Sequence, residues 1–308
     1  MQKTSTPSRG APSRKATAAA HAPKPGQVID ELRSGQSIEL LKELHILTRD
    51  GRLNQDTRRK LKQVYHLYQF IEPLLAEVSA GGQGFTLADH GAGKSYLGFI
   101  LYDLFFNVAR LGKPANGHVY GIENRAELVD KSRLLAARLG FANMSFLALS
   151  VQEATTSAAL PARVDIVTAL HACDTATDDA IAFGLVKQAR HMVLVPCCQA
   201  EVAGVLKKSR ALNLSKNPLA ELWRHPLHTR EFGSQITNVL RCLQLEANGY
   251  QVTVTELVGW EHSMKNELIL ASRPAVPAAR QTAAAQARLQ QVLNELGLGE
   301  LTARFAGP

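Results

Sequence analysis

The sequence lacks the features of secreted and membrane-spanning proteins. Four cysteines in 308 residues, of which Cys197 and Cys198 are adjacent, are too few and too poorly spaced for a disulfide scaffold. No run reaches the roughly 18 apolar residues that a membrane helix needs, and the N-terminus has no apolar signal segment. We therefore expect reduced thiols and a soluble cytoplasmic protein without a membrane partner.

Negative charge is scarce at the N-terminal end. Residues 1–62 contain 13 Lys and Arg but 6 Asp and Glu, so this segment carries +7 of the total formal net charge of +8. A basic appendage on a nearly neutral body favours binding to a polyanion, and nucleic acid fits better than a membrane because no apolar face accompanies the first basic residues. A solubilising tail is the alternative explanation.

Hydrophobic periodicity divides the chain into four regions. Residues 1–26 are rich in Ala, Pro, Ser, Thr and Lys and show no periodicity, so we expect a disordered basic tail. Residues 27–79 have helical spacing and predict a helical extension, and residues 275–308 predict a C-terminal helical tail. The remaining region, residues 80–274, alternates short apolar strands with helices.

A cluster of cations stands at the start of the second predicted helix of the extension. Arg58, Arg59, Lys60 and Lys62 fall where positive charge opposes the helix dipole, so the cluster serves something other than helix stability. We take Arg58, Arg59 and Lys62 as candidate RNA contacts. A solvated helix face is the alternative.

The alternation in residues 80–274 predicts a doubly wound α/β fold with a mostly parallel, Rossmann-like sheet covered on both faces. The sequences "YQVTVTELVGW" and "NELILASR" predict a closing strand pair, which adds an antiparallel strand to the sheet. Such a hairpin-like end is generally absent from dinucleotide dehydrogenases.

The turn "TLADHGAGKSY" follows the first of these strands and ends like a triphosphate-binding loop. That loop requires G-x-x-x-x-G-K-[ST], and counting back from Gly93-Lys94-Ser95 places Ala88 where its first glycine belongs. The later strands also run into Pro196 and His171 rather than into an aspartate that could hold magnesium. The pattern therefore disfavours a nucleotide triphosphatase.

The same turn fits S-adenosylmethionine better. Asp89, Gly91 and Gly93 form D-x-G-x-G, in which the glycines let the backbone pass close beneath the methionine part of the cofactor, while Asp89 can orient its amino group directly or through water. Glu123 ends the second strand in "VYGIEN", where a carboxylate can accept both ribose hydroxyls. A helix cap for Asp89 and a loop acid for Glu123 are the alternatives.

The third strand adds a further part of the predicted cofactor site. Ser150, Val151 and Gln152 follow this strand, at the position where the adenine edge would lie. We include them among the candidate cofactor-binding residues.

Four segments together carry a family resemblance. "DHGAGKSYL", "LHACDTATDDAI", "VPCCQ" and "MKNELILA" resemble class I methyltransferases with the motifs D-x-G-x-G-K-x-Y-L, L-H-A-C-x-x-A-T-D and P-C-C, a group that includes relatives of eukaryotic tRNA 2′-O-methyltransferases acting on the acceptor stem. The resemblance covers about residues 62–273 and implies the fold, S-adenosylmethionine as cofactor and RNA as substrate. Asp174 stands where many members carry Gly, and the N-terminal region has no Cys and His cluster, so the zinc module of the tRNA enzymes is absent.

Polar residues after the fourth and fifth strands should meet the cofactor at the carboxyl edge of the sheet. His171 or Asp174 could accept a proton from an acceptor hydroxyl or orient it, and Lys94 could approach the acceptor or a phosphate. A packed neutral His, a helix-capping Asp and a solvated Lys are the alternatives. Lys265 and Asn266 begin the last strand and could line the acceptor pocket.

The cysteines near this edge allow three interpretations. A zinc site with Cys173, Cys197, Cys198 and His171 is awkward, because adjacent cysteines on an extended strand point to opposite faces. A cysteine nucleophile would need an exposed, activated thiol, whereas buried packing is the simplest account. We predict no metal and place Cys197 among the substrate-binding candidates. A protein or small-molecule methyltransferase and a non-catalytic cofactor-binding scaffold remain alternative functions.

Overall fold

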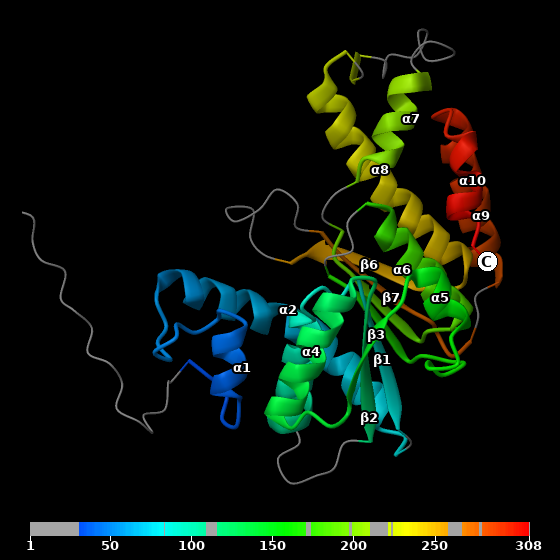
Figure 1. The fold of residues 1–308 in the computed structure, drawn as a ribbon. Coiled ribbons are helices and arrows are strands. Elements are labelled where there is room, and N and C mark those ends of the chain that lie inside the picture. Colours follow the sequence, from blue (N-terminus) through cyan, green and yellow to red (C-terminus); the bar gives the residue numbers. More distant parts are fainter. Residues whose placement is uncertain are drawn as a thin grey trace, which may run out of the picture.

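A seven-stranded sheet with the order β3-β2-β1-β4-β5-β7-β6 forms the centre of the protein (Figure 1). The computed structural model describes residues 31–82, 84–108, 116–170, 174–196, 199–209, 221–222, 224–257, 267–276 and 279–307. The strands are β1 (Phe85–His90), β2 (Gly117–Glu123), β3 (Met144–Ala148), β4 (Ile166–Ala169), β5 (His191–Leu194), β6 (Gln251–Glu256) and β7 (Glu267–Ser272).

The strand directions confirm the predicted fold class. β1 to β5 run parallel to one another, and β7 is antiparallel to both β5 and β6. Every predicted strand is present, because each is a short apolar run bounded by turn residues. In this topology, the carboxyl ends of β1, β2 and β4 meet at one edge, where ligands of open α/β sheets bind.

Helices cover both faces of the sheet (Figure 1). Side chains alternate along each strand, so Leu87 packs into the core under α2, α3 and α4, whereas the neighbouring Ala88 packs on the opposite side under α5 and α6. These helices are α2 (Gln55–Ser79), α3 (Tyr96–Tyr102), which continues as a π-helical turn over Asp103–Val108, α4 (Ala126–Leu139), α5 (Val151–Thr156) and α6 (Thr175–Val186).

The N-terminal helix is shorter than its sequence pattern predicts. The helical spacing covers most of residues 29–47, but α1 spans only Ile38–Glu43. Gly35 adopts a left-handed turn with φ of 86°, and Ser37 then caps the helix by accepting a hydrogen bond from the Leu40 backbone N–H at 3.2 Å. The cap and the turn therefore interrupt what the apolar pattern alone predicts as one helix.

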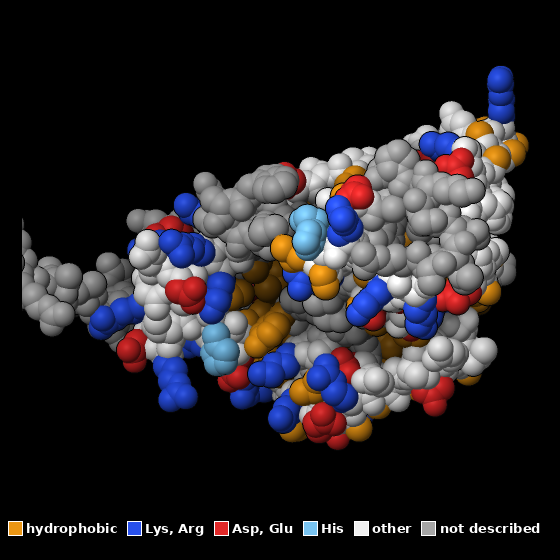
Figure 2. Space-filling view, turned by 90° about the horizontal axis from the view of Figure 1, so that it is seen from above, with side chains coloured by type: hydrophobic (Ala, Val, Ile, Leu, Met, Phe, Trp, Pro, Cys, Tyr) orange, Lys and Arg blue, Asp and Glu red, His pale blue; other side chains and the backbone are white. Residues whose placement is uncertain are grey.

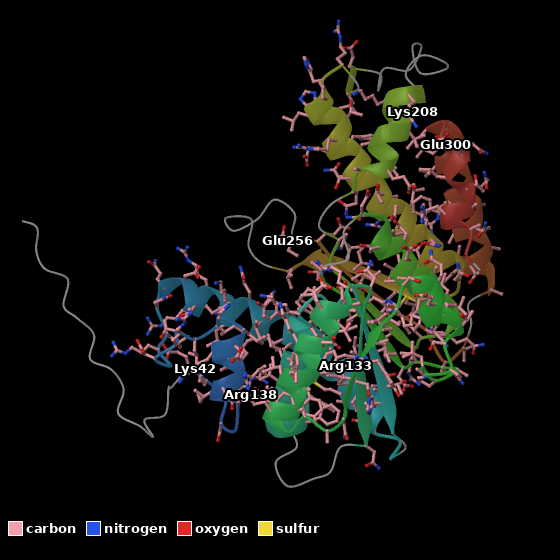
Figure 3. All side chains as sticks on the ribbon, viewed as in Figure 1. Lys42, Arg133, Arg138, Lys208, Glu256 and Glu300 are labelled. Atoms are coloured by element: carbon pink, nitrogen blue, oxygen red, sulfur yellow. The ribbon has the colours of Figure 1, made fainter. Side chains whose placement is uncertain are left out.

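The helical extension packs directly against the sheet layer. The Ser37 backbone N–H donates to the buried carboxylate of Asp103 at 3.1 and 3.2 Å. Arg138 of α4 forms ion pairs with Glu39 and Glu43 of α1, and Figure 3 shows it beside that helix. Apolar residues of α1 and α2 share one core with those of β1 and α3. The extension and the sheet therefore bury a common apolar surface.

A helical group rises beyond the carboxyl edge on the other side (Figure 1). It consists of α7 (Glu201–Ser209), α8 (Pro226–Ala247), α9 (Ala279–Glu295), a short 3₁₀ turn (Gly299–Leu301) and α10 (Thr302–Phe305). Their apolar faces form a separate core that includes Leu206, Leu240 and Phe305. The predicted C-terminal helical tail is therefore α9, the 3₁₀ turn and α10, packed along α8.

The predicted tail at residues 1–26 lies outside the described residues. No described helix is long and apolar enough to cross a membrane.

Candidate cofactor and acceptor site

The turn after β1 combines three left-handed residues in five positions. Gly91, Gly93 and Ser95 have φ values of 62°, 57° and 52°. A Cβ atom added to Gly93 would find no heavy atom nearer than Arg125 Nη2 at 3.9 Å. The backbone at Gly93 is therefore open on the side that a side chain would cover, as a close-lying ligand requires. Lys94 is exposed on this turn.

Asp89 lies beneath the turn rather than on its surface. Its side chain is 2 % exposed and accepts a hydrogen bond from the Thr168 hydroxyl of β4 at 2.8 Å. Burial raises the pKa of Asp89 to about 7, against the lowering effects of the Thr168 hydroxyl and the Gly98 backbone N–H. This carboxylate therefore links β1, β4 and the first turn of α3, which defines the shape of the turn above it.

Glu123 ends β2 beside the same turn. Its Oε2 atom accepts the Gly93 backbone N–H at 2.8 Å, and its Oε1 atom accepts the Arg125 backbone N–H at 3.1 Å. Burial alone would raise the pKa of Glu123, but the hydrogen bonds from Arg125 and Gly93 hold it below its usual value. The side chain is therefore an ionised, oriented carboxylate next to the glycine turn.

The predicted adenine-side residues adjoin this carboxylate through the backbone. The Leu149 N–H donates to the Glu123 carbonyl at 3.1 Å, which places Ser150 and Val151 at the same edge. Ser150 caps α5 in a capping box with Glu153, and the helix that it starts is only six residues long. Val151 is half-buried and Gln152 is exposed. Asp89, Gly91, Gly93, Glu123 and the residues after β3 thus lie along one edge.

Asp174 has structural partners in the segment after β5. Its Oδ1 atom accepts the backbone N–H groups of Ala200 and Glu201 at 2.9 and 3.4 Å, so it caps α7 rather than its own helix α6. Its backbone φ is 51°. The loop after β4 is therefore tied to the segment after β5, and a catalytic role for Asp174 stays a prediction.

A buried polar network lies directly behind Asp174. Arg241 of α8 is fully buried and donates to both carboxylate oxygens of Asp178, at 2.7 and 2.8 Å, and to the Asp174 carbonyl at 2.8 Å. Asn238 accepts from Arg241 at 3.1 Å and from Gln199 at 3.0 Å. These contacts hold the start of α6, the segment after β5 and α8 in one arrangement.

Sequence reasoning missed four residues around the site. Thr168 and Arg241 carry no local signal, because their partners are distant in the sequence. Arg125 follows Glu123 by two positions but resembles any charged residue at a helix start. His90 is buried against Phe183, with ring centroids 4.2 Å apart and no hydrogen-bond partner for either ring nitrogen in the described part of the chain, and burial lowers its pKa to about 3.

Several predicted residues lie outside the described residues: His171, Cys173, Cys197, Cys198, Lys265 and Asn266. Within the described ranges, no group of three or more His, Cys, Asp or Glu side chains could hold a metal ion. The predictions for these six residues therefore stay predictions. Cys242 is a free thiol whose pKa burial raises to about 12.

The three predicted cationic contacts lie on the exposed side of α2. Arg58 forms an ion pair with Glu31 at 2.9 Å. Arg59 and Lys62 are exposed, and neither has an ion-pair partner among the residues that the structure describes. The Asn54 capping box satisfies the start of the helix without them. Two positive charges on the first turns of α2 are thus available to a ligand.

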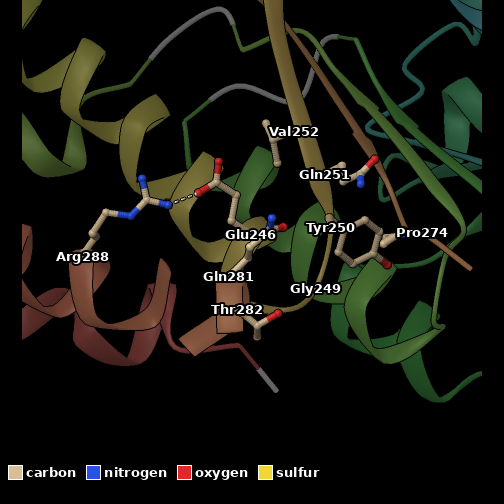
Figure 4. A pocket seen from close by; sticks show the side chains of 9 residues that line it. All are labelled: Glu246, Gly249, Tyr250, Gln251, Val252, Pro274, Gln281, Thr282 and Arg288. Carbon is tan, nitrogen blue, oxygen red and sulfur yellow. Dashed lines mark hydrogen bonds and ion pairs between the residues drawn. The ribbon is translucent and has the colours of Figure 1, made fainter. Parts of the chain in front are cut away.

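Two hollows lie at opposite ends of the sheet. Seen from above the carboxyl edge, the surface is hollowed between the N-terminal helices and the rest of the molecule, with hydrophobic side chains inside and Lys and Arg side chains around it (Figure 2). Figure 4 shows a different pocket, of about 310 Å³, between α8, β6 and α9. Gln251 in that pocket pairs with Ser272, which pairs with the first residue of β5, so the pocket lies at the amino edge, away from the glycine turn.

Comparison with known proteins identifies the class. Residues 59–205 match a family model described as a methyltransferase domain. No curated protein sequence matches the chain significantly. Residues 59–205 therefore form a methyltransferase domain, and the strand order and the Gly93–Glu123 contact at the carboxyl edge agree with S-adenosylmethionine as its cofactor.

Solved structures with a similar arrangement act on different substrates. Magnesium protoporphyrin IX methyltransferase from Synechocystis PCC 6803 is 17% identical over 77% of this chain and 93% of that one, with a TM-score of 0.41. An rRNA methylase from Streptococcus thermophilus is 10% identical over 65% and 92%, with a TM-score of 0.40. Fibrillarin from Methanococcus jannaschii is 12% identical over 62% and 67%, with a TM-score of 0.38. Likeness at this level says nothing about the substrate of this chain.

Proposed function

We propose that the protein transfers the methyl group of S-adenosylmethionine to RNA, with tRNA or rRNA as the substrate class. The observation that carries the proposal is the pair of exposed cations Arg59 and Lys62, which have no acidic partner among the described residues. They follow a segment with a strong surplus of positive charge. Neutralising phosphates is the main source of RNA affinity, so cations without internal partners are the groups it needs.

The position of these cations supports the same substrate. The first turns of α2 lie level with the carboxyl edge of the sheet, on the side of the hollow opposite α7 and α8 (Figures 1 and 2). A backbone held along α2 would pass near the cofactor turn. The sequence resemblance to tRNA 2′-O-methyltransferases, carried by "DHGAGKSYL" and "LHACDTATDDAI", favours RNA independently.

The residues present fit the cofactor. Gly93 leaves its backbone uncovered, and Glu123 is a buried, ionised carboxylate at the end of β2 that accepts several N–H donors. The Gly91–Gly93 turn would lie against the methionine part, Glu123 would bind the ribose, and the residues from Ser150 to Gln152 would flank the adenine. When bound, S-adenosylmethionine supplies an activated methyl group on a sulfonium with a good leaving group.

Positioning of the acceptor is therefore the main task of the protein. We propose that His171 and Lys94 orient the acceptor group, with Asp174 contributing through the loop that it holds against α7. Cys197, Lys265 and Asn266 would line the acceptor pocket. The buried Arg241–Asp178 pair holds the start of α6, next to this loop, and would thereby help to position the acceptor.

The proposal is tested by RNA binding and methyl transfer with matched charge variants. Filter binding of bulk tRNA and rRNA fragments across a salt series, with radiolabelled methyl transfer, is measured for the wild type, a deletion of residues 1–26 and Arg59→Glu/Lys62→Glu. The control is Lys131→Glu/Arg163→Glu, which reverses two exposed cations elsewhere. Loss of two phosphate contacts should reduce the slope of log affinity against log salt by about 2.

Each outcome separates the candidate substrates. A reduced slope and reduced methylation in the α2 variant, with the control unchanged, supports RNA. Affinity independent of salt, or equal losses in both double variants, would reject RNA. If the deletion and the α2 variant kept full methyl transfer to a protein or a small molecule, the substrate would belong to that alternative class.

A further inference from the structure

The Arg125 side chain binds the Glu123 carboxylate, which is the group expected to hold the cofactor ribose. Its Nε atom donates to Glu123 Oε1 at 2.8 Å and its Nη2 atom donates to Oε2 at 3.2 Å. The backbone N–H groups of Arg125 and Gly93 take one further position on each oxygen. An ionised carboxylate has about four acceptor positions. All of them are therefore used by protein donors.

The Arg125 side chain and a ribose diol would use the same acceptor positions of the Glu123 carboxylate. Both present two adjacent donors to the two oxygens of one carboxylate, a guanidinium through two N–H groups and a diol through two O–H groups. The backbone donors are fixed by the turn and by the start of α4. Only the Arg125 side chain can leave, because it is 59% exposed whereas the Glu123 side chain is 6% exposed.

A nearby acidic side chain can receive the displaced guanidinium. Glu127, in the first turn of α4, is exposed and already contributes to raising the pKa of Arg125, after the larger contributions of Glu123. No other hydrogen bond or ion pair anchors the Arg125 side chain within the described ranges. A rotation of this side chain toward α4 therefore breaks no hydrogen bond or ion pair of the described residues other than those with Glu123.

We propose that Arg125 is a displaceable competitor of the cofactor ribose: it holds Glu123 in its binding orientation and must swing away when the ribose binds. The inference rests on S-adenosylmethionine as the cofactor and is independent of RNA as the substrate. It assigns Arg125 to the control of cofactor affinity. Because every binding event replaces the guanidinium, the wild type binds more weakly than a protein without it.

Calorimetric titration with S-adenosylhomocysteine tests the proposal without turnover or RNA. The proteins are the wild type, Arg125→Ala, Arg125→Lys and the control Lys131→Ala, which removes an exposed cation from the same helix. We expect Arg125→Ala to bind about three- to tenfold more tightly, the range for release of a well-aligned but exposed ion pair, and Arg125→Lys to be intermediate because it cannot donate in bidentate fashion. Lys131→Ala should equal the wild type.

Two further readouts identify the mechanism. Raising the salt concentration screens the Arg125–Glu123 pair, so the difference between Arg125→Ala and the wild type should shrink. In a Glu123→Gln background, Arg125→Ala should lose most of its effect, because the competing ion pair no longer exists.

Several results would overturn the inference. Weaker binding by both Arg125 variants would make the guanidinium a cofactor contact rather than a competitor. Equal affinities of Arg125→Ala and the wild type would show that Arg125 does not compete with the ribose. The same conclusion would follow if the gain in affinity persisted undiminished in the Glu123→Gln background. If the wild type bound no S-adenosylhomocysteine, the cofactor assignment would fail and this inference with it, whereas failure of RNA methylation alone would leave it intact.

Discussion

Arg241 of α8 and Asp178 of α6 form a bidentate ion pair that water does not reach. The side chains are 0% and 3% exposed, and the Nε–Oδ1 and Nη2–Oδ2 distances are 2.7 and 2.8 Å. They are 63 positions apart in the sequence. The pair joins the start of α6 to α8, the helix that precedes β6, so it connects the segment after β4 to the last two strands.

Removal of one partner of this pair should destabilise the fold strongly. Arg241→Leu leaves the Asp178 carboxylate buried without its counter-ion, which typically costs about 3–5 kcal/mol of unfolding free energy. Chemical denaturation measures the loss. Arg230→Leu, which breaks an exposed pair with Glu231 on the same helix, is the control and should cost less than about 1 kcal/mol. Similar losses in the two variants would show that the buried pair has no special importance.

The titration of Asp89 should make stability depend on pH. Its pKa in the folded protein is about 7, above the ordinary value of 3.8, so the folded state holds the proton more tightly than the unfolded chain does. The resulting stabilisation is complete below about pH 4 and is lost as the pH rises through 7, a change of roughly 4 kcal/mol by linkage.

Thermal melts of the wild type and Asp89→Asn across pH 4–8 check this sign. The wild type should lose stability relative to Asp89→Asn as the pH rises, because the amide does not titrate. Asp130→Asn changes an exposed acid of α4 and should follow the wild-type curve. Parallel curves for the wild type and Asp89→Asn would show that the Asp89 carboxyl titrates alike in both states.

Two glycines near the turn should respond differently to alanine. A Cβ atom on Gly98 would lie 2.6 Å from the Oγ atom of the buried Ser95, so Gly98→Ala should lower stability by about 1–3 kcal/mol through overpacking. A Cβ atom on Gly93 would make only ordinary van der Waals contacts, at 3.9 Å from Arg125 Nη2 and 4.0 Å from the Gly91 carbonyl oxygen, so Gly93→Ala should cost about 1 kcal/mol for its left-handed backbone yet weaken S-adenosylhomocysteine binding by more than tenfold. Melting curves measure the loss of stability, and calorimetry measures the affinity for S-adenosylhomocysteine. Wild-type affinity in Gly93→Ala would show that the cofactor does not bind against this turn.

Asp174 offers a direct choice between capping and catalysis. Asn can also accept the Ala200 and Glu201 N–H groups but cannot take a proton at neutral pH. If the side chain only caps α7, Asp174→Asn should keep both stability and methyl transfer, whereas Asp174→Ala should lose about 1 kcal/mol of stability. A stable Asp174→Asn protein with at least a hundredfold loss of turnover at unchanged cofactor affinity would instead make the carboxylate catalytic.

The sheet could be predicted from sequence because its signal is local. Each strand from β1 to β5 is a short apolar run, and the acid at the end of β2 follows from the strand boundary alone. The short helices α5 and α7 were not predicted, since six and nine residues give little periodicity. The apolar spacing of "KSYLGFILYDLFFNVARLG" predicts a helix from Lys94, but α3 begins at Tyr96 because Lys94 and Ser95 belong to the turn.

The contacts of the site could not be predicted from the sequence where the partners are distant in the chain or where two groups bind the same residue. The D-x-G-x-G spacing predicts a cofactor turn but says nothing of Thr168, which reaches Asp89 from a strand 79 positions away. The boundary of the second strand predicts Glu123 as a ribose ligand but does not reveal that Arg125 donates to the same oxygens. A local pattern can name a functional group, whereas competition for that group depends on the fold.

The contact between Ser37 and Asp103 restricts how the gene can be shortened. Asp103 is completely buried in the π-helical turn after α3, and it accepts hydrogen bonds from the backbone N–H at the start of α1. A fragment that begins at α2 would expose a carboxylate and the apolar residues beneath it. Expression boundaries for this enzyme should therefore be placed before residue 31, and insertions or deletions within residues 31–53 should be tolerated far less than changes in ordinary linkers.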